Sequence, residues 1–365
     1  MNTQIAIWFL SLGLIGLLAM TVLFPVLGSL LYRFFGPSSS DAVVNPSHSD
    51  WVILIPVHND LVHLQATLTS LPRSVRIVVG LDACTDKSEE YLAAKGIEFK
   101  KFSFKSKWLV LQELVKEVSE ARVALVDVGA IWPSGIIEEL NRYWALPDTI
   151  AVAPTYRPKD SGALEAWAWR LEACLKGIEN LAGGPVAIHG ASVCYSRPAL
   201  QAAFDGLVLS SQWKNDDVVI PLCLRMLFPR GRIRYVKSLA IQDLGIQRGG
   251  FPLRRRLRML IGNIEVARWA FSGFGSRFSI AHVLFLRRMA RVLWVYDLLF
   301  FALALLAWLS QSSSRILGGQ FVLGLFVLVL FFKWNRMSSI AAAALASFLA
   351  PVFMISRSMR NKIVW

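Results

Sequence analysis

The stretch Trp51-Val-Ile-Leu-Ile-Pro-Val-His-Asn-Asp60 decides the fold, because an apolar run of strand length ends there on polar residues. Val123-Ala-Leu-Val-Asp127 repeats the pattern. Such apolar runs are typical of parallel strands that are buried on both faces and that deliver polar side chains at their carboxyl ends. Ligands bind at those ends in open α/β sheets. The sequence therefore predicts a parallel-sheet domain with a binding site along one edge.

Strands and helices alternate outward from this stretch. The strands are expected over residues 52–57, 76–81 and 123–128. The helices between and after them are expected over residues 60–70, 87–95 and 107–119. Later elements are expected to be an amphipathic helix over 163–180, a strand pair or a strand and loop over 186–195, and a helix over 216–227. This alternation implies right-handed crossovers onto a mostly parallel sheet.

Apolar segments bracket this domain. Residues 5–31 contain no charged residue and are long enough to span roughly 30 Å of hydrocarbon. A cleaved signal peptide is the alternative, but the run is too long, no basic residue precedes it and no small-x-small site follows. Further apolar runs occupy residues 293–309, 316–332 and 338–355. The first of these contains Asp297, which in a membrane helix must face protein or water.

Basic residues set the expected orientation of these segments. Arg33 follows the first segment, and Arg287, Arg288 and Arg291 precede the second. The positive-inside rule then places the chain between them in the cytoplasm. Three C-terminal spans would put the basic tail outside, so either one segment is re-entrant or interfacial or the tail is an exception.

The expected organisation has six parts. They are an N-terminal transmembrane helix (1–34), a linker (35–50), a cytoplasmic α/β domain (51–265), a basic interfacial segment (266–291), a transmembrane region of two or three helices (292–356) and a basic tail (357–365). The protein is accordingly expected to be integral to the inner (cytoplasmic) membrane.

The distribution of charge indicates a lipid surface rather than a nucleic acid. The chain has 365 residues, 55% of them hydrophobic and 18% charged, with a formal net charge of +14. Thirteen arginines and only two acidic residues lie between positions 230 and 291. A basic belt directly before apolar segments suits anionic lipid headgroups or a phosphate-bearing substrate.

The four cysteines point to a reducing compartment. Cys84, Cys174, Cys194 and Cys223 show no metal-type spacing such as C-x-x-C, and we expect buried free thiols.

Two polar motifs follow the first two strands. Pro56-Val-His-Asn-Asp60 could close over a nucleotide base, or Asn59 or Asp60 could simply cap the next helix. Asp82-Ala-Cys-Thr-Asp86 could present a carboxylate to a uracil or ribose, or form a turn in which Asp86 caps a helix.

Two further motifs carry carboxylates. Asp127 ends a strand, where it could hold Mg²⁺ or Mn²⁺ against a diphosphate, because hard cations prefer oxygen ligands. The alternative is a buried, capped aspartate. Asn215-Asp-Asp217 precedes an apolar helix and could be a capping pair. Two adjacent carboxylates also repel each other, which favours a raised pKa and suits a general base.

In this order the four motifs resemble those of glycosyltransferase family 2, whose members are inverting enzymes of GT-A fold that use sugar nucleotides. The family pattern is Pro-x-x-Asn-Glu, Asp-x-Ser/Cys-Thr-Asp, Asp-x-Asp and an acidic pair before a helix. Pro56, Asn59 and Asp60 match the first part, with Asp in place of Glu, and Asp82-Ala-Cys-Thr-Asp86 matches the second. Lys107 stands where the family often has Gly-Lys, with Ser106 in place of the glycine.

The resemblance covers about residues 50–265 and implies roles for its matching residues. The fold would be a Rossmann-like mixed, mostly parallel sheet flanked by transmembrane helices. Asp82 would hold the uridine of a UDP-sugar, and Asp217, beside Asp216, would deprotonate the acceptor hydroxyl. Gly190 and Arg197 resemble the family's acceptor-side strand. The segment 254–263, with Arg255 and Arg258, resembles the basic segment that closes over the diphosphate, although a membrane-surface helix explains it nearly as well.

The chain departs from the family pattern in two places. Asp-x-Asp appears as Asp127-Val-Gly129, so the second metal-facing carboxylate is missing. Metal could still bind through Asp127 and the diphosphate, or arginines such as Arg255 and Arg258 could partly replace it. The Gln-x-x-Arg-Trp signature of processive synthases is also absent, which favours a single-transfer enzyme.

The sequence therefore predicts a membrane-bound inverting glycosyltransferase with a nucleotide-sugar donor and a lipid-linked or cell-envelope glycan acceptor. The metal cofactor would be Mg²⁺ or Mn²⁺ at Asp127. The alternative is a catalytically impaired family member that binds nucleotide sugars or scaffolds a polysaccharide assembly complex. A transport protein with a cytoplasmic regulatory domain is disfavoured by the small number of apolar segments.

Overall fold

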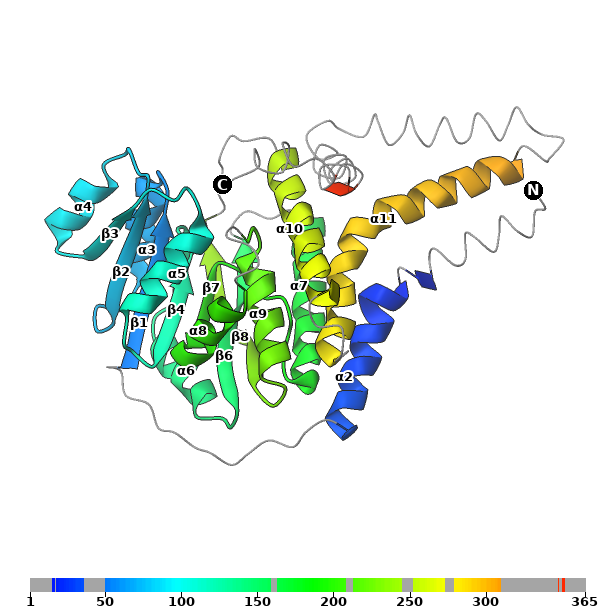
Figure 1. Ribbon diagram of the computed structural model, residues 1–365, viewed down its shortest axis with the longest axis horizontal. Helices are drawn as coiled ribbons and strands as arrows, with labels where there is room; N and C mark the ends of the chain where they lie inside the picture. Colours follow the sequence, from blue (N-terminus) through cyan, green and yellow to red (C-terminus); the bar gives the residue numbers. More distant parts are fainter. Residues whose placement is uncertain are drawn as a thin grey trace. The chain divides into compact units, whose positions relative to one another are not determined.

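The computed structural model describes residues 15–16, 18–35, 50–158, 163–207, 213–244, 252–272, 279–309, 347 and 350–351 (Figure 1). Residues 5–14 and 17 of the first apolar run, residues 36–49 of the expected linker, the apolar run at 316–332, nearly all of the run at 338–355 and the basic tail lie outside these residues. In the part of the chain that is described, no helix is both long and apolar enough to cross a membrane.

The described residues form two compact units. The larger unit holds residues 26–35 of helix α2 (Phe24–Phe35), the whole β-sheet with its helices, and the start of α11 (Ile280–Leu309). The smaller unit holds η1 (Ala19–Leu23), α10 (Pro252–Ser272) and α11 from residue 286 onward. Its core is formed by Leu257, Leu260, Ile261, Val292 and Ala350.

One eight-stranded sheet organises the larger unit. Its strands are β1 (Trp51–Val57), β2 (Arg76–Asp82), β3 (Glu98–Phe102), β4 (Arg122–Val126), β5 (Ala130–Ile131), β6 (Thr149–Pro158), β7 (Ser192–Ser196) and β8 (Arg232–Asp243). The order across the sheet is β3-β2-β1-β4-β7-β6-β8-β5. Strands β1 to β4 are parallel to one another, β7 is antiparallel to both of its neighbours, and β6 is parallel to β8. The mixed, mostly parallel sheet expected from the sequence is confirmed.

The helices of the larger unit complete its order of elements. They are α3 (Leu61–Ser70), α4 (Ser88–Lys95), α5 (Lys107–Glu117), α6 (Ile136–Trp144), α7 (Ala163–Glu179) with the short η3 (Asn180–Ala182), α8 (Arg197–Gly206) and α9 (Asp216–Leu227). The helices predicted from the sequence agree with these bounds to within two residues.

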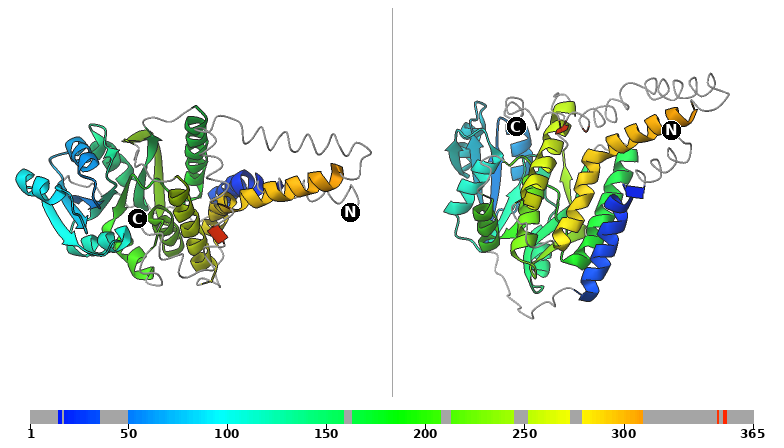
Figure 2. Two further views of the ribbon diagram at one scale, coloured as in Figure 1. Left: turned by 90° about the horizontal axis from the view of Figure 1, so that it is seen from above. Right: turned by 45° about the vertical axis from the view of Figure 1, so that its right-hand side comes forward.

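Helices cover both faces of the sheet (Figure 1, Figure 2). All seven residues of β1 are buried, as expected for a strand with two covered faces. Trp51, Ile53 and Ile55 share a core with side chains of α3, α4 and α6. On the opposite face α5 approaches β2 closely, because Gly80 has no side chain: a Cβ there would lie 2.5 Å from Val110 Cγ1.

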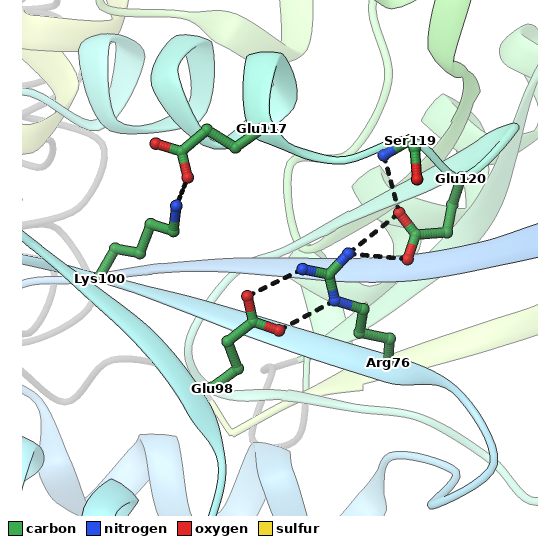
Figure 3. Close-up of polar contacts among 6 residues, drawn as sticks. All are labelled: Arg76, Glu98, Lys100, Glu117, Ser119 and Glu120. Carbon is green, nitrogen blue, oxygen red and sulfur yellow. Dashed lines mark hydrogen bonds and ion pairs between the residues drawn. The ribbon is translucent and has the colours of Figure 1, made fainter.

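Charged side chains form ion pairs at the end of the sheet where β2 and β3 begin (Figure 3). The Arg76 guanidinium donates to Glu98 on one side and to Glu120 on the other, at 2.8 to 3.3 Å. Lys100 forms a further ion pair with Glu117 of α5. These contacts lie at the end of the strands opposite to the predicted binding edge.

The cysteines are free thiols, but not all are buried as expected. Cys194 in β7 and Cys223 in α9 are buried, whereas Cys84 is half-buried and Cys174 of α7 is exposed. Cys174 shares its side of α7 with Trp167 and Leu171, which are also exposed, whereas Glu172, Lys176 and Glu179 are buried.

Candidate functional site

A lysine links two carboxylates at the carboxyl end of β4. Asp127 follows that strand, Lys107 is the first residue of α5, and Asp216 is the first residue of α9. Lys107 Nζ lies 2.6 Å from Asp127 Oδ1 and 2.9 Å from Asp216 Oδ2. Three segments that are far apart in the sequence therefore meet at one ammonium group.

Gly190 lies between Asp217 and Asp127, so Asp217 is also close to this group of side chains. A Cβ at Gly190 would lie 3.5 Å from Asp217 Cβ and 3.6 Å from Asp127 Oδ2, so the bare backbone separates the two side chains. Two backbone hydrogen bonds fix the loop before β7: Ile188 N donates to Asp217 O at 2.9 Å, and Asp127 N donates to Ala191 O at 3.0 Å. The structure thus brings together Lys107, Asp127, Gly190, Asp216 and Asp217, all of which were selected from the sequence.

The electrostatics of this cluster are set by burial and mutual contact. Burial raises the pKa of Asp127 above its ordinary value; Lys107 opposes this rise, whereas Asp216 and Asp217 add to it. Burial alone would lower the pKa of Lys107, but Asp127 and Asp216 outweigh it and the pKa is raised. Lys107 is therefore a cation at neutral pH, and it offsets the repulsion within the acidic pair.

The loops after β1 and β2 are joined by Asn59. This residue has a left-handed backbone (φ 52°), and its Oδ1 accepts hydrogen bonds from Thr85 N at 2.6 Å and Asp86 N at 3.2 Å. Asp86 Oδ2 accepts from Leu61 N at 3.0 Å, and Asp86 Oδ1 accepts from Ser88 N at 3.2 Å. Asp86 thus binds the first turns of both α3 and α4, and capping of α3 by the Asn59 or Asp60 side chain is wrong.

Pro56 and Asp60 lie in and just after β1. Pro56 is buried and pairs with Gly80 of β2. The buried Asp60 carboxylate accepts a hydrogen bond from His63 Nδ1 at 2.6 Å. Neither side chain is among the contacts around Lys107.

Asp82 is fully buried and holds the segment that leads to Lys107. Its Oδ1 accepts from Lys105 N at 2.9 Å, and its Oδ2 accepts from Ser106 N at 2.7 Å. His58 Nδ1 donates to the Asp82 carbonyl at 2.6 Å, which connects this segment to the end of β1. Asp82 therefore positions Lys107, whatever contact it makes with a nucleotide, and the assignment to uridine stays a prediction.

A carboxylate from β8 lies beside the glycine that replaces the second aspartate. Gly129 has φ 98°, and a Cβ there would lie 3.3 Å from Asp243 Oδ1. Asp243 pairs with Ala130, whose N donates to Asp127 O at 3.1 Å, so Asp127 and Asp243 flank the same turn. Sequence reasoning missed Asp243, and the only signal was its place as one of two acids in an arginine-rich region.

The oxygen donors at this turn suit a divalent cation. No group of three or more acidic, histidine or cysteine side chains that could hold a metal occurs within the described ranges. Mg²⁺ typically binds one or two carboxylates and completes its shell with water and substrate phosphate. Asp127 and Asp243 fit that requirement, and Asp243 takes the space that a second aspartate would have filled.

Arg197 is a further predicted residue that lies away from the cluster. Arg197 follows β7, and because β7 runs antiparallel to β4, Ser196 pairs with Arg122 at the start of β4. Arg197 therefore lies at the opposite end of the strands from Asp127, and its grouping with Gly190 on an acceptor side is wrong. Arg255 and Arg258 belong to α10, in the smaller unit.

The fold is similar to that of solved glycosyltransferases. The mannosyltransferase PcManGT from Pyrobaculum calidifontis, solved with GDP-Man and Mn²⁺, gives a TM-score of 0.67 at 16% identity, over 94% of this chain and 99% of that chain. Glucosyl-3-phosphoglycerate synthase from Mycobacterium tuberculosis, solved with Mn²⁺, UDP and phosphoglyceric acid, gives only 0.41 at 14% identity, over 58% of this chain and 78% of that chain. The first match identifies the GT-A fold, as expected from the sequence motifs; the second is too weak to support an argument. The chain matches no protein-family model, and no curated protein resembles it in sequence.

Proposed function

We propose that this chain is an inverting glycosyltransferase that moves a sugar from a nucleoside diphosphate donor, a UDP-sugar in the first instance, to a hydroxyl acceptor. One observation carries the proposal: Asp127 and Asp217 lie on either side of the bare Gly190 backbone, with Lys107 bound to Asp127 and to Asp216. The GT-A fold supports it, and the similar mannosyltransferase was solved with GDP-Man.

The proposed reaction uses the two sides of this cluster differently. Asp217 takes the proton of the acceptor hydroxyl, whose oxygen attacks the anomeric carbon from the face opposite the nucleotide. The bond between that carbon and the diphosphate oxygen breaks, and its electron pair leaves with the nucleotide. Lys107 contacts Asp127, on the side of the cluster where the diphosphate would lie. Its positive charge there stabilises the negative charge that develops on the diphosphate.

A divalent cation, Mg²⁺ or Mn²⁺, would be held by Asp127 and Asp243. When bound there, it would neutralise the negative charge of the donor diphosphate. The similar mannosyltransferase was solved with Mn²⁺, which supports this assignment.

The proposal extends to a membrane surface. Helix α2 exposes large apolar side chains along its length: Phe24, Leu27, Leu30, Leu31 and Phe34, the last 75% exposed. Its opposite side packs closely against α11, because a Cβ at Gly28 would lie 2.9 Å from Ile280 Cδ1. An apolar stripe with Arg33 at its end is suited to contact with a lipid bilayer. This stripe supports the proposal that the protein is anchored to a membrane.

The same proposal covers the acceptor and the compartment. We place the protein in the inner (cytoplasmic) membrane with its sheet domain in the cytoplasm, acting on a lipid-linked or cell-envelope glycan acceptor. A lipid-borne acceptor would bring its hydroxyl to an enzyme that sits at the bilayer surface. Equal transfer to a water-soluble acceptor without vesicles would contradict this part.

A second candidate is a nucleotide-sugar-binding or scaffold subunit without activity. Gly129 in place of a carboxylate favours it, since a weakened metal site would impair turnover. The two candidates differ in donor hydrolysis, because a binding subunit would take up the donor and leave it intact.

The test is nucleotide release from a panel of UDP- and GDP-sugars by the full-length, detergent-solubilised protein. Each donor is incubated with Mg²⁺, with Mn²⁺ or with EDTA. Release from one donor that falls by roughly 10²-fold or more in Asp217→Asn supports the proposal. Asp205→Asn, on the exposed side of α8, is the matched control and should keep full activity. Binding of a donor without release would favour the scaffold, and neither binding nor release would overturn both.

A further inference from the structure

An aromatic cluster lies next to the candidate site, on the half of the sheet that the nucleotide motifs do not use. Its members are Tyr156 of β6, Trp169 of α7 and His189 of the loop before β7. The Tyr156 and Trp169 ring centroids are 4.8 Å apart and their planes meet at 51°. His189 lies 5.5 Å from Tyr156 and 5.2 Å from Trp169. Because the two larger rings are tilted, neither covers the face of the other.

Two contacts tie this cluster to the Asp127 and Asp217 centre. His189 immediately precedes Gly190, the residue that separates those carboxylates. Tyr156 OH donates to Asp243 Oδ2 at 3.1 Å, and Asp243 Oδ1 lies beside Gly129. The cluster therefore reaches the reacting centre through both the loop before β7 and the end of β8.

Buried polar side chains contact the cluster at His189. Lys176 is fully buried, with Nζ 3.2 Å from His189 Nε2, and Tyr235 OH is 3.3 Å from that nitrogen. Asn180 fixes Tyr235 with two backbone hydrogen bonds of 2.8 and 2.9 Å. The position of the His189 ring, against which Tyr156 and Trp169 pack, is thus set before any ligand arrives, and such preorganisation lowers the entropic cost of binding.

The three members of the cluster differ in solvent exposure. His189 is 7% exposed, whereas Tyr156 and Trp169 are each half-buried and keep solvent-accessible surface. Half-exposed rings with fixed tilt suit a flat, partly apolar ligand, such as the C–H face of a pyranose against the negative face of an aromatic ring.

We infer that Tyr156 and Trp169 form the subsite for a sugar ring of the acceptor. The inference rests on the proposed function, which it deepens by naming a saccharide as the acceptor class. The contact with the proposed base argues for acceptor over donor. The nucleotide motifs follow β1 and β2, on one side of β4, while the aromatic cluster belongs to β6 and α7, on the other. The Ile188 N to Asp217 O hydrogen bond also fixes this loop against the proposed base, which must contact the acceptor.

The test is saturation-transfer NMR on the full-length solubilised protein with the methyl glycosides of glucose, mannose, galactose and N-acetylglucosamine. We expect ring-proton transfer to at least one glycoside, reduced roughly fivefold in Trp169→Ala and largely kept in Trp169→Phe. Trp167→Ala is the matched control, since Trp167 lies two residues earlier on α7 and is 59% exposed. No transfer to any glycoside, or equal transfer in Trp169→Ala and wild type, would overturn the inference.

Titration calorimetry with UDP and GDP separates this inference from the proposed function. Nucleotide affinity in Trp169→Ala should equal that of the wild type. An equal loss of nucleotide affinity would assign the rings to the donor and overturn the acceptor subsite. Absence of nucleotide binding in the wild type would instead count against the proposed function, with the glycoside result standing on its own.

Discussion

Lys107 Nζ lies 2.9 Å from Asp216 Oδ2, an ion pair that joins the first residue of α5 to the first residue of α9. The same ammonium contacts Asp127, so one side chain joins the proposed donor side to the acidic pair. Its position depends on the Asp82 carboxylate, which holds the two residues before it. Removal of the Lys107 ammonium and removal of the Asp82 carboxylate should therefore have different effects on the site.

Replacement of the bridging lysine tests the cluster directly. In Lys107→Met the repulsion among Asp127, Asp216 and Asp217 is no longer offset, and the charge on the leaving diphosphate loses a partner. We expect nucleotide release to fall by roughly 10²-fold, the usual effect of removing one electrostatic contact to a transition state. Lys116→Met on the same helix is the control, because Lys116 only pairs with Glu113 at the surface. Similar rates in the two variants would remove Lys107 from the site.

Loss of the Asp82 carboxylate should act through position. Asn at this site can accept from only one of the Lys105 and Ser106 amides, so one buried N–H loses its partner, at a cost of about 1–3 kcal/mol in unfolding free energy. We expect a lower urea midpoint together with slower nucleotide release, because Lys107 is no longer held in place. Full stability of Asp82→Asn would show that the two hydrogen bonds contribute little.

Restoration of the missing aspartate should harm the protein. Gly129→Asp puts a side chain on a backbone with φ 98° and places a carboxylate against Asp243 Oδ1. The backbone strain costs about 1–3 kcal/mol, and charge repulsion adds to it. Gly96→Asp also places an aspartate at a positive φ (63°), but with open space around it, so it is the comparison without a neighbouring carboxylate. Urea unfolding should show the larger loss for Gly129→Asp.

The role of Asp243 predicts a metal dependence. In Asp243→Asn the turn after Asp127 keeps its shape but loses a charged oxygen, so we expect roughly tenfold weaker Mn²⁺ binding by electron paramagnetic resonance. Tyr156→Phe removes the hydrogen bond to Asp243 but keeps the Asp243 carboxylate, so it should change Mn²⁺ affinity much less. Unchanged Mn²⁺ affinity in Asp243→Asn would leave Asp127 as the sole carboxylate ligand.

The ion pairs at the β2 and β3 edge predict a pH effect on stability (Figure 3). Hydrogen bonding to Arg76 lowers the pKa of Glu98 below its ordinary value of 4.5, although burial opposes the shift. A lowered folded-state pKa means that the contribution is present above pH 4.5 and is lost as pH falls through the folded value. Wild type and Glu98→Gln should therefore differ in urea midpoint at pH 7 and converge near pH 3. A constant difference at both pH values would exclude this linkage.

Local patterns in the sequence account for much of the fold. Residues 51–57 are apolar throughout because both faces of β1 are covered, and that run is visible without any structure. Strand β3 was missed because Glu98, Lys100 and Lys101 interrupt the pattern, as is usual for an edge strand. Most of the site residues that were found lie at the ends of predicted strands or begin predicted helices, whereas Gly190 lies in the loop before β7.

What sequence reasoning missed depends on pairing between distant segments. Asp243 gains its place from the pairing of β5 with β8, more than a hundred residues apart. Arg197 was misplaced because a strand's direction cannot be read from its residues, and β7 runs against β4. Lys107 was selected by position in a motif, but its contact with Asp216 required the fold.

The antiparallel strand β7 also predicts the order in which the strands of the sheet form during folding. Val52 pairs with Arg76 and Val78 pairs with Glu98, so the mutual pairing of β1, β2 and β3 closes only short loops. Strand β7 must cross back from residue 192 before β6 and β8 can join them, and longer loops cost more entropy to close. We expect backbone amides of β1 and β2 to gain protection before those of β6 in pulsed hydrogen exchange during refolding. The chain would then form the half of the sheet that carries the proposed nucleotide site first, and the half with the proposed acceptor subsite last.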